Sequence, residues 1–192
     1  MRELSLHILD LAENAVTAGA RLVAITVEES AAADRLTIRV ADDGPGLPEE
    51  KLRRLEDPFV TTRTTRRVGL GLSLLAAAAR RAGGGVEVRS APGAGTEVTA
   101  VFRLGHIDRA PIGDVAATIA ALIAGYPAVD FVYRHRIEER EIALDTRELR
   151  TAAEGVDPAD PALAEGIARW LREELERLAR GGKEGCDAQD DR

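Results

Sequence analysis

The sequence predicts an α+β protein: a two-layer sandwich in which helices cover one face of a mixed β-sheet. Two observations predict this class. Apolar residues recur at helical spacing near the N-terminus, and they alternate with polar residues in the segments that follow. The expected order of elements over residues 1–104 is helix, two strands, helix, loop, helix and two strands. Helices that connect pairs of strands in this way can all pack on one side of a sheet.

The first helix is expected over residues 3–18 and is expected to end at Gly19. Its apolar stripe consists of Leu4, Ile8, Leu11 and Ala15. The elements expected after it are half-buried strands at 22–28 and 35–41, a short helix at 48–55, a helix at 70–82, and strands at 86–89 and 97–103.

The second half of the chain predicts a smaller α+β unit. Its expected elements are a linker at 105–111, a helix at 112–124, an antiparallel hairpin of strands 130–136 and 141–145, and an amphipathic helix at 161–180 that carries the only tryptophan. The chain is therefore predicted to contain a core domain at 1–104, a C-terminal α+β appendage at 105–180 and a disordered tail at 181–192, which has almost nothing to bury.

Composition excludes several classes of function. The chain has 26 Lys and Arg against 33 Asp and Glu, a formal net charge of -7, so it lacks the basic signal of a nucleic-acid-binding domain. Its single cysteine, Cys186, excludes an intramolecular disulfide. No apolar run is long enough to span a bilayer, and the charged residues Arg2 and Glu3 are unlike a secretory leader. We therefore expect a cytoplasmic protein.

Four short motifs follow one another in the first half of the chain. They are Asp-Leu-Ala-Glu-Asn at 10–14, Asp-Asp-Gly-Pro-Gly at 42–46, Gly-Leu-Gly-Leu at 69–72 and Gly-Ala-Gly-Thr at 93–96. Each motif alone is weak, because Gly-x-Gly usually marks only a turn. Together, in this order, they resemble the N, G1, G2 and G3 boxes of the GHKL ATP-binding superfamily. The segment 57–63 resembles the F box of histidine kinases, which favours the signalling branch. The resemblance covers residues 1–104 and implies the same two-layer fold, of the Bergerat type, with ATP and Mg²⁺ as cofactors.

On the first helix, Asp10 and Asn14 are four residues apart and share one face. The resemblance implies that the side-chain oxygen of Asn14 binds Mg²⁺, for which oxygen is the preferred ligand atom. Asp10 occupies the position at which hydrolytic members of the superfamily carry a glutamate that activates water. The shorter acid reaches less far, so it suits phosphoryl transfer to a protein, or simple nucleotide binding, better than efficient hydrolysis. The neighbouring Glu13 either assists Mg²⁺ or faces solvent.

The second and fourth motifs imply adenine recognition. By resemblance, the Asp42 carboxylate accepts a hydrogen bond from the exocyclic amine of adenine, where guanine presents a carbonyl group. Gly44 and Gly46 let the backbone approach the base closely. Thr96 resembles the residue that supports adenine recognition beside Asp42.

The third motif implies phosphate binding, since its glycines immediately precede a helix, where free backbone amides favour an anion. The short Thr- and Arg-rich loop 61–67 resembles the lid over ATP, although its arginines could equally be solvated. The nucleotide-binding residues assigned to this part of the chain are Thr62, Arg63, Gly69, Leu70, Gly71 and Leu72.

These residues predict an ATP-binding regulatory protein that transfers phosphate from Mg-ATP to a separate, unidentified protein, as a kinase in signal transduction. The alternative is a non-kinase ATP-operated clamp, or a weak ATPase, that regulates a partner. In histidine kinases the phosphorylated histidine stands in a His-Glu pair at the start of a long dimerising helix. None of the three histidines, His7, His106 and His135, has this context, so histidine autophosphorylation is not expected. The appendage is expected either to dock a partner or a second copy of the chain, as a homodimer, or to pack within its own chain.

Overall fold

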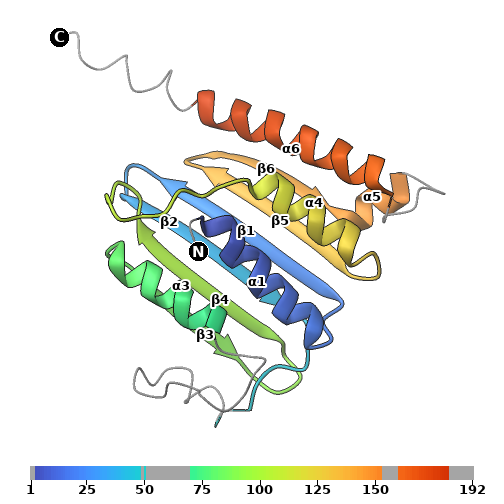
Figure 1. Ribbon diagram of the computed structural model, residues 1–192, viewed down its shortest axis with the longest axis horizontal. Helices are drawn as coiled ribbons and strands as arrows, with labels where there is room; N and C mark the ends of the chain where they lie inside the picture. The colour runs from blue at the N-terminus through green and yellow to red at the C-terminus, as the bar shows by residue number, and fades with distance from the viewer. Residues whose placement is uncertain (1–2, 49, 51–69, 153–159, 182–192) are drawn as a thin grey trace.

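The computed structural model describes residues 3–48, 50, 70–152 and 160–181. It contains a six-stranded sheet in the order β3-β4-β2-β1-β5-β6 (Figure 1). The strands are β1 (Leu22–Ser30), β2 (Arg35–Asp42), β3 (Gly85–Ser90), β4 (Thr96–Arg103), β5 (Asp130–Ile137) and β6 (Arg140–Asp145). The described helices are α1 (Leu4–Thr17), α3 (Leu70–Arg81), α4 (Val115–Gly125), α5 (Thr146–Ala152) and α6 (Pro161–Arg180). The β1–β5 pair is parallel and the other pairs are antiparallel, so the sheet is mixed, as predicted.

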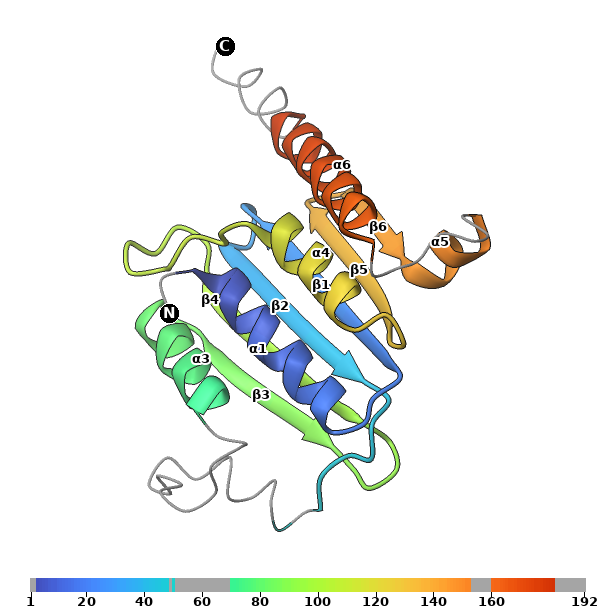
Figure 2. The same cartoon turned by 45° about the vertical axis from the view of Figure 1, so that its right-hand side comes forward.

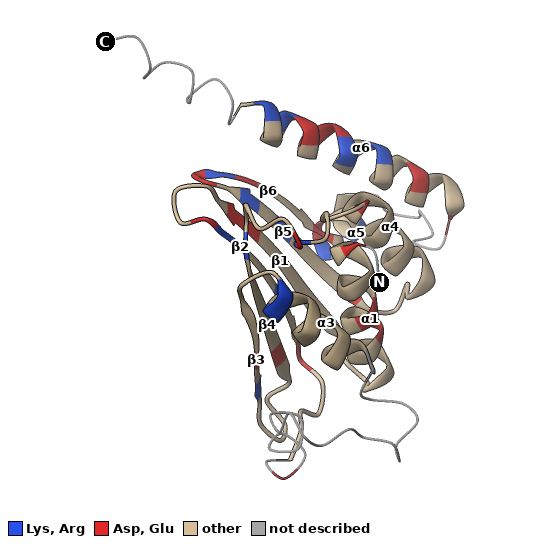
Figure 3. Ribbon diagram, turned by 60° about the vertical axis from the view of Figure 1, so that its left-hand side comes forward, with Lys and Arg blue, Asp and Glu red and all other residues tan. Residues whose placement is uncertain are grey.

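The helices lie on one face of this sheet (Figure 3). The strand residues that face them are buried and apolar, and alternate with half-buried or exposed residues on the open face. In β1 these inward residues are Val23, Ile25 and Val27. Arg39 and Glu97, from neighbouring strands, lie on the open face, where their charged groups stay hydrated. The predicted two-layer α+β class is therefore confirmed.

Helix α1 lies over the middle of the sheet and buries Leu4, Ile8 and Ala12 completely. Leu11, which was expected in this stripe, is only partly buried. The first turn of a helix leaves backbone N–H groups without intrahelical partners. The linker supplies partners here: the N–H groups of Leu4 and Ser5 donate to the carbonyl oxygens of Pro111 and Ile112, at 3.0 and 2.7 Å.

The predicted hairpin forms, and it joins the sheet of the N-terminal half. Strand β5 runs parallel to β1, with Ile25 opposite Tyr133. Phe131 and Tyr133 are fully buried, so the apolar face of the hairpin packs within its own chain. Of the alternatives open for this face, intramolecular packing is the one observed. The segments on the two sides of residue 104, where the sequence predicted a domain boundary, share one sheet and one hydrophobic core.

Two polar side chains of β5, Tyr133 and His135, and Glu29 of β1 form a hydrogen-bond network. The Tyr133 hydroxyl lies 2.8 Å from His135 Nδ1, and His135 Nε2 lies 2.9 Å from Glu29 Oε1. Burial raises the pKa of the Tyr133 phenol, and the negative charge of Glu29 raises it further. Each of these three side chains has a hydrogen-bond partner, so the network is a fully hydrogen-bonded part of the core.

Two local features of the C-terminal half differ from the sequence prediction. Helix α4 begins at Val115 instead of residue 112, because the Asp114 side chain caps it by accepting a hydrogen bond from the N–H of Ala117 at 2.8 Å. Helix α5 was not predicted; Thr146, at its start, accepts a hydrogen bond from the N–H of Phe131 at 2.9 Å. Most of the predicted helix 48–55, the F-box segment, the loop 61–67 and all but the first residue of the tail lie outside the described residues. None of the described helices is long and apolar enough to cross a bilayer.

Candidate nucleotide-binding site

The predicted adenine and metal residues come from three elements that meet at one end of the sheet. Figure 2 shows the end of α1, the end of β2 and the turn between β3 and β4 gathered there. The loop after β2 packs against the connection between α1 and β1: a methyl group on Gly44 would lie 3.6 Å from the Ala20 nitrogen. The fold therefore brings the N, G1 and G3 motifs together.

Asp42 is the last residue of β2, and its carboxylate is half-buried. Its Oδ1 accepts a hydrogen bond from the N–H of Gly44 at 2.8 Å. Burial raises the pKa of Asp42, while the backbone N–H groups of Gly44 and Thr96 oppose that shift. A carboxylate that is partly desolvated at the rim of a loop is suited to accept a hydrogen bond from a ligand amine.

The neighbouring Asp43 has a structural role. Its Oδ1 accepts hydrogen bonds from the N–H groups of Arg21 and Leu22, at 2.7 and 2.9 Å. These bonds lower the pKa of Asp43 and fix the loop after β2 to the start of β1. Of the two adjacent carboxylates, Asp42 is therefore the one left for a ligand.

Ser90, which was not predicted as a site residue, joins the loop after β2 (residues 43–48) to the turn between β3 and β4 (residues 91–95). We call these two segments the adenine-side loops, after the predicted role of the motifs that they contain. Its hydroxyl oxygen accepts a hydrogen bond from the N–H of Leu47, and its O–H donates one to the carbonyl oxygen of Gly95, both at 2.8 Å. It also lies 2.9 Å from Thr96 Oγ1. A serine at the end of a strand, directly before Ala-Pro-Gly, was the available signal in the sequence.

Gly46 is required at the crossing of these loops. Its φ of +68° is a conformation that L side chains rarely adopt. A methyl group there would also overlap the carbonyl oxygen of Ala91 in the opposite loop. Gly46 thus allows a close contact between the two loops, whereas the approach of its backbone to the base stays a prediction.

Asp10 faces the start of α3. A methyl group on Gly71 would overlap Asp10 Oδ2, so the carboxylate occupies the space that a side chain at position 71 would need. Oδ2 is buried and has no hydrogen-bond partner within the described ranges. Asn14 is half-buried one turn further along α1, and no hydrogen bond to its side chain is formed within those ranges. A buried carboxylate oxygen without a partner is costly and calls for a ligand or a water molecule.

The other predicted residues divide into two groups. Leu70 begins α3, and Leu72 is half-buried against the core. Thr62, Arg63 and Gly69 lie outside the described residues, so their roles remain predictions. Glu13 was expected either to assist Mg²⁺ or to face solvent. The structure favours the second alternative, because the Glu13 side chain is exposed and accepts a hydrogen bond from the Tyr126 hydroxyl at 3.3 Å.

The three histidines are poorly placed to accept a phosphoryl group. His7 and His135 are buried, and His106 Nδ1 accepts a hydrogen bond from the N–H of Asp108 at 3.1 Å. A buried imidazole cannot reach a bound nucleotide without movement of its helix or strand.

The residues that are present fit a Mg-nucleotide. Asp42 offers an acceptor for an amine, Asp10 Oδ2 is unsatisfied, and the Asn14 amide supplies a hard oxygen. Within the described ranges, no three His, Cys, Asp or Glu side chains converge on a metal position. An ion held through Asn14 would therefore take most of its ligands from phosphate groups and water, as Mg²⁺ commonly does.

A mixed sheet covered by helices on one face, with glycine loops beside an Asp/Asn pair on α1, is the architecture of a two-layer nucleotide-binding domain. Residues 2–106 match the profile of the histidine kinase-, DNA gyrase B-, and HSP90-like ATPase family. The chain belongs to this family. The predicted resemblance is confirmed, and ATP is the nucleotide of the family.

Curated relatives of the matched region include sensor kinases. The chain is 41% identical over 108 residues to the sensor protein kinase FleS of Pseudomonas aeruginosa, covering 56% of this chain and 26% of FleS. It is 40% identical over 68 residues to the nitrogen regulation protein NtrY of Azorhizobium caulinodans, covering 35% of this chain and 9% of NtrY. The chain thus spans about a quarter or less of the length of these relatives.

Solved structures with a related arrangement include the Aquifex aeolicus MutL ATPase domain complexed with ADP. The TM-score is 0.49 and the sequence identity 18%, with 76% of this chain and 63% of that chain covered. The histidine kinase domain of the blue-light activated kinase EL346 of Erythrobacter litoralis is also similar, with a TM-score of 0.39 and 19% identity over 54% of this chain and 44% of that one.

Proposed function

We propose that this chain binds Mg-ATP between α1, α3 and the two adenine-side loops, and that it transfers the terminal phosphoryl group to a separate, unidentified protein. The observation that carries the proposal is the buried, unpartnered Oδ2 of Asp10 against Gly71. A carboxylate without a protein partner, beside the glycine motif that is predicted to bind phosphate, is placed to act as a general base. The sensor kinases among the relatives support kinase activity.

Each residue of the site would have a distinct task. Asp42 and Thr96 recognise adenine, with Ser90 holding their loops together. Asn14 binds Mg²⁺. The lid residues Thr62 and Arg63 and the motif Gly69-Leu70-Gly71-Leu72 contact the phosphates. When bound, Mg-ATP supplies the transferable phosphoryl group and neutralises its charge.

The short side chain of Asp10 favours transfer over hydrolysis. Its carboxylate is held against Gly71, so it is fixed in one place on the α3 side of α1. We infer that Asp10 Oδ2 takes the proton of an acceptor group that enters the site from a partner protein. A small, freely diffusing water molecule would be held less well than such a docked acceptor.

The alternative function is an ATP-operated clamp, or a weak ATPase, that regulates a partner protein. One observation favours it: β5 pairs directly with β1, whose first residue Leu22 is held by Asp43 of the adenine-side loop. A movement of that loop would therefore be coupled through β1 to the C-terminal elements.

Partner contacts are proposed for the outward face of α6. The apolar face of the hairpin is buried, whereas Trp170 of α6 is exposed. An exposed tryptophan is a common anchor in protein interfaces. An unidentified partner, or a second copy of the chain in a homodimer, would bind there. Light scattering and pull-down with Trp170→Ala test this: complexes of unchanged size and yield would exclude the α6 face.

Asp10→Asn provides the test of the kinase proposal. We expect the variant to bind ATP nearly as well as the wild type, but to transfer label from γ-labelled ATP to a co-purified partner about 100-fold more slowly or worse, because the base is lost. Asp108→Asn, in an exposed loop remote from the site, is the matched control and should transfer normally.

The same assay separates the two functions. Label on the partner supports the kinase, whereas slow release of free phosphate without transfer supports the clamp or weak ATPase. Transfer by Asp10→Asn at the wild-type rate would refute the role of Asp10.

A further inference from the structure

The edge strand β3 leaves one row of its backbone groups without partners. It ends the sheet order β3-β4-β2-β1-β5-β6, so it pairs with β4 on one side only (Figure 2). Within the described ranges, its backbone forms no hydrogen bond other than those of the pair with β4. A methyl group on Gly85, the first residue of the strand, would meet no atom of those ranges within 4 Å. An open edge of this kind is a template for another strand.

The open face of β3 carries two opposite charges, on Glu87 and Arg89. Arg89 Nε donates to Glu87 Oε1 at 2.8 Å, and the two side chains are 71% and 60% exposed, the arginine more than the glutamate. Arg89 also lies 3.9 Å from Glu97 of β4, which in turn lies 3.9 Å from Arg39 of β2. Charges of alternating sign therefore cross this face from β2 to β3, and they end at the edge of the sheet.

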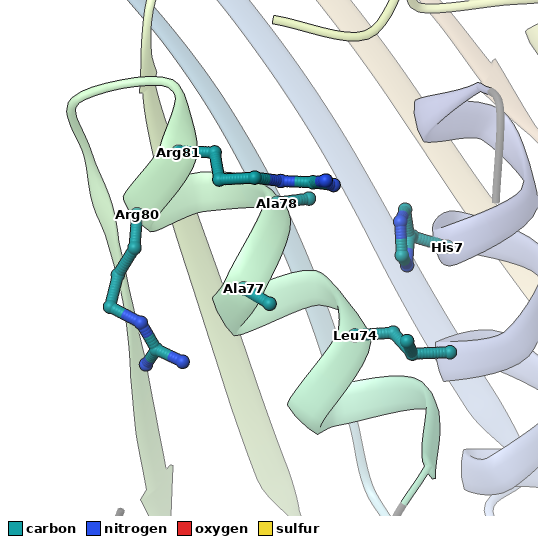
Figure 4. A pocket seen from close by; sticks show the side chains of 6 residues that line it. All are labelled: His7, Leu74, Ala77, Ala78, Arg80 and Arg81. Carbon is teal, nitrogen blue, oxygen red and sulfur yellow. The ribbon is translucent and has the colours of Figure 1, made fainter. Parts of the chain in front are cut away.

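The inner face of β3 is apolar and incompletely covered. Val86 and Val88 pack against the hydrophobic core but are only half-buried. Helix α3 contacts β3, and Figure 4 shows its Leu74 and Arg81 side chains directed toward α1, over the middle of the sheet. Since α3 and β4 cover the other sides of the two valines, their remaining exposed surface lies toward the edge.

We propose that β3 is a dimerisation surface, where it pairs antiparallel with β3 of a second copy of the chain about a two-fold axis beside Val88. In this register Glu87 of each copy lies opposite Arg89 of the other, and Val88 lies opposite its own counterpart. Both six-stranded sheets then form one continuous sheet, with the helices of the two copies on the same face. A two-fold axis makes each cross-strand contact occur twice.

The charges on the open face select this register. Directly opposed residues of an antiparallel pair point to the same face, so Glu87 and Arg89 meet only residues of the open face of the other copy. Moving the register by two residues would place Glu87 opposite Glu87, or Arg89 opposite Arg89. Opposite charges stabilise such pairs and like charges destabilise them. In the selected register, the alternation of charge continues from one copy into the next.

The other edge strand, β6, offers no such match. Its open-face residues are Glu141, Ala143 and Asp145, so antiparallel pairing with a second copy places Glu141 opposite alanine or opposite another acid. A methyl group on Gly181, after the end of α6, would overlap the Arg140 side chain, so this end of the chain lies against β6. A second copy is therefore assigned to β3, at the opposite edge of the sheet from the α6 surface proposed for partner contacts.

Sedimentation equilibrium of the full chain, without nucleotide, tests the proposed dimer. Strands of 6 residues bury little surface, so the dimer is expected to be weak and to appear as the protein concentration rises toward the millimolar range. Glu87→Arg and Arg89→Glu each place like charges opposite one another twice in the dimer. Each variant alone should therefore dimerise about tenfold more weakly or worse. Glu141→Arg on β6, the matched control, and Trp170→Ala on α6 should associate like the wild type.

An equimolar mixture of Glu87→Arg and Arg89→Glu separates a contact at β3 from a general effect on folding. In the mixed dimer opposite charges face each other at both positions, so the mixture should associate more strongly than either variant alone. Damage to the fold of the two variants would not produce this recovery.

Three results would overturn the proposal: a wild type that stays monomeric at every concentration, association that neither charge reversal weakens, or a mixture that associates no better than its components. The assay contains neither nucleotide nor partner protein, so its failure is distinguishable from failure of the proposed kinase function.

Discussion

Asp42→Asn should abolish the preference of this protein for ATP over GTP. The carboxylate at the end of β2 is the proposed acceptor for the adenine amine, and an amide side chain can turn a donor toward either base. We expect a loss of about 1–3 kcal/mol in ATP binding, roughly 5- to 150-fold in affinity. Isothermal calorimetry with both nucleotides measures it. Equal affinity of the wild type for ATP and GTP would remove the basis of the assignment.

Asp42→Asn should not destabilise the protein in the absence of nucleotide. Burial raises the pKa of Asp42, so ionisation of this carboxyl opposes folding at neutral pH. A group with a raised folded-state pKa contributes stability that is present below its unfolded pKa and is lost as the pH rises. At pH 7 the neutral asparagine should therefore give an equal or higher melting temperature than the wild type, provided that its oxygen still accepts from Gly44.

The pH dependence of this difference provides a check. The advantage of Asp42→Asn should fade as the pH falls through the raised pKa of Asp42 and should vanish below about pH 3.9, where aspartate is protonated in both states. Thermal unfolding at several pH values measures it. A melting temperature below that of the wild type at pH 7 would show that the carboxylate supports the fold instead.

The elements that the sequence predicted best are those whose patterns are local. The alternation of Val23, Ile25 and Val27 identifies a strand with one buried face, and the glycine after Arg180 agrees with the observed end of α6. The start of α4 was misplaced because Ile112 and Gly113 carry no capping group, whereas Asp114 does. A cap depends on one hydrogen bond, which hydrophobic periodicity does not reveal.

The pairing of β5 with β1 could not be predicted in this way. Both strands alternate correctly, but the alternation does not say which edge of the sheet receives the hairpin. The parallel register of Val23 with Phe131 depends on α4 crossing over the sheet between the two halves of the chain. The sequence therefore predicted the pieces of the C-terminal half but not their continuity with the N-terminal sheet.

At the candidate site, the motifs identified the candidate residues but not the separate role of each one. Ser90 lies outside all four motifs, yet it connects the loops that contain two of them. The separate roles of Asp42 and Asp43 follow from which backbone N–H groups lie within reach of each carboxylate. Such contacts arise between segments far apart in sequence, so a single sequence does not contain them as a pattern.

Gly71→Ala should be strongly disruptive, even though alanine is the better helix former. At the start of α3, intrinsic propensity favours alanine by up to about 1 kcal/mol. The new methyl group would, however, overlap Asp10 Oδ2, and the two helices would have to shift. We expect a net loss of about 1–3 kcal/mol in the free energy of unfolding, which is typical of an overpacked site. Urea denaturation measures this change.

A double-mutant cycle assigns the loss to this contact. Asp10→Ala removes the overlapping carboxylate, so Gly71→Ala should cost little or even stabilise in that background. Gly166→Ala, inside α6 with no atom within 4 Å of the added methyl group, is the control and should stabilise. Phosphate transfer by Gly71→Ala should also fall by about 100-fold, because Asp10 is displaced from the α3 side of the site. An equal cost of Gly71→Ala with and without Asp10 would show that the carboxylate does not occupy this space in solution, and the proposed position of the general base would then be wrong.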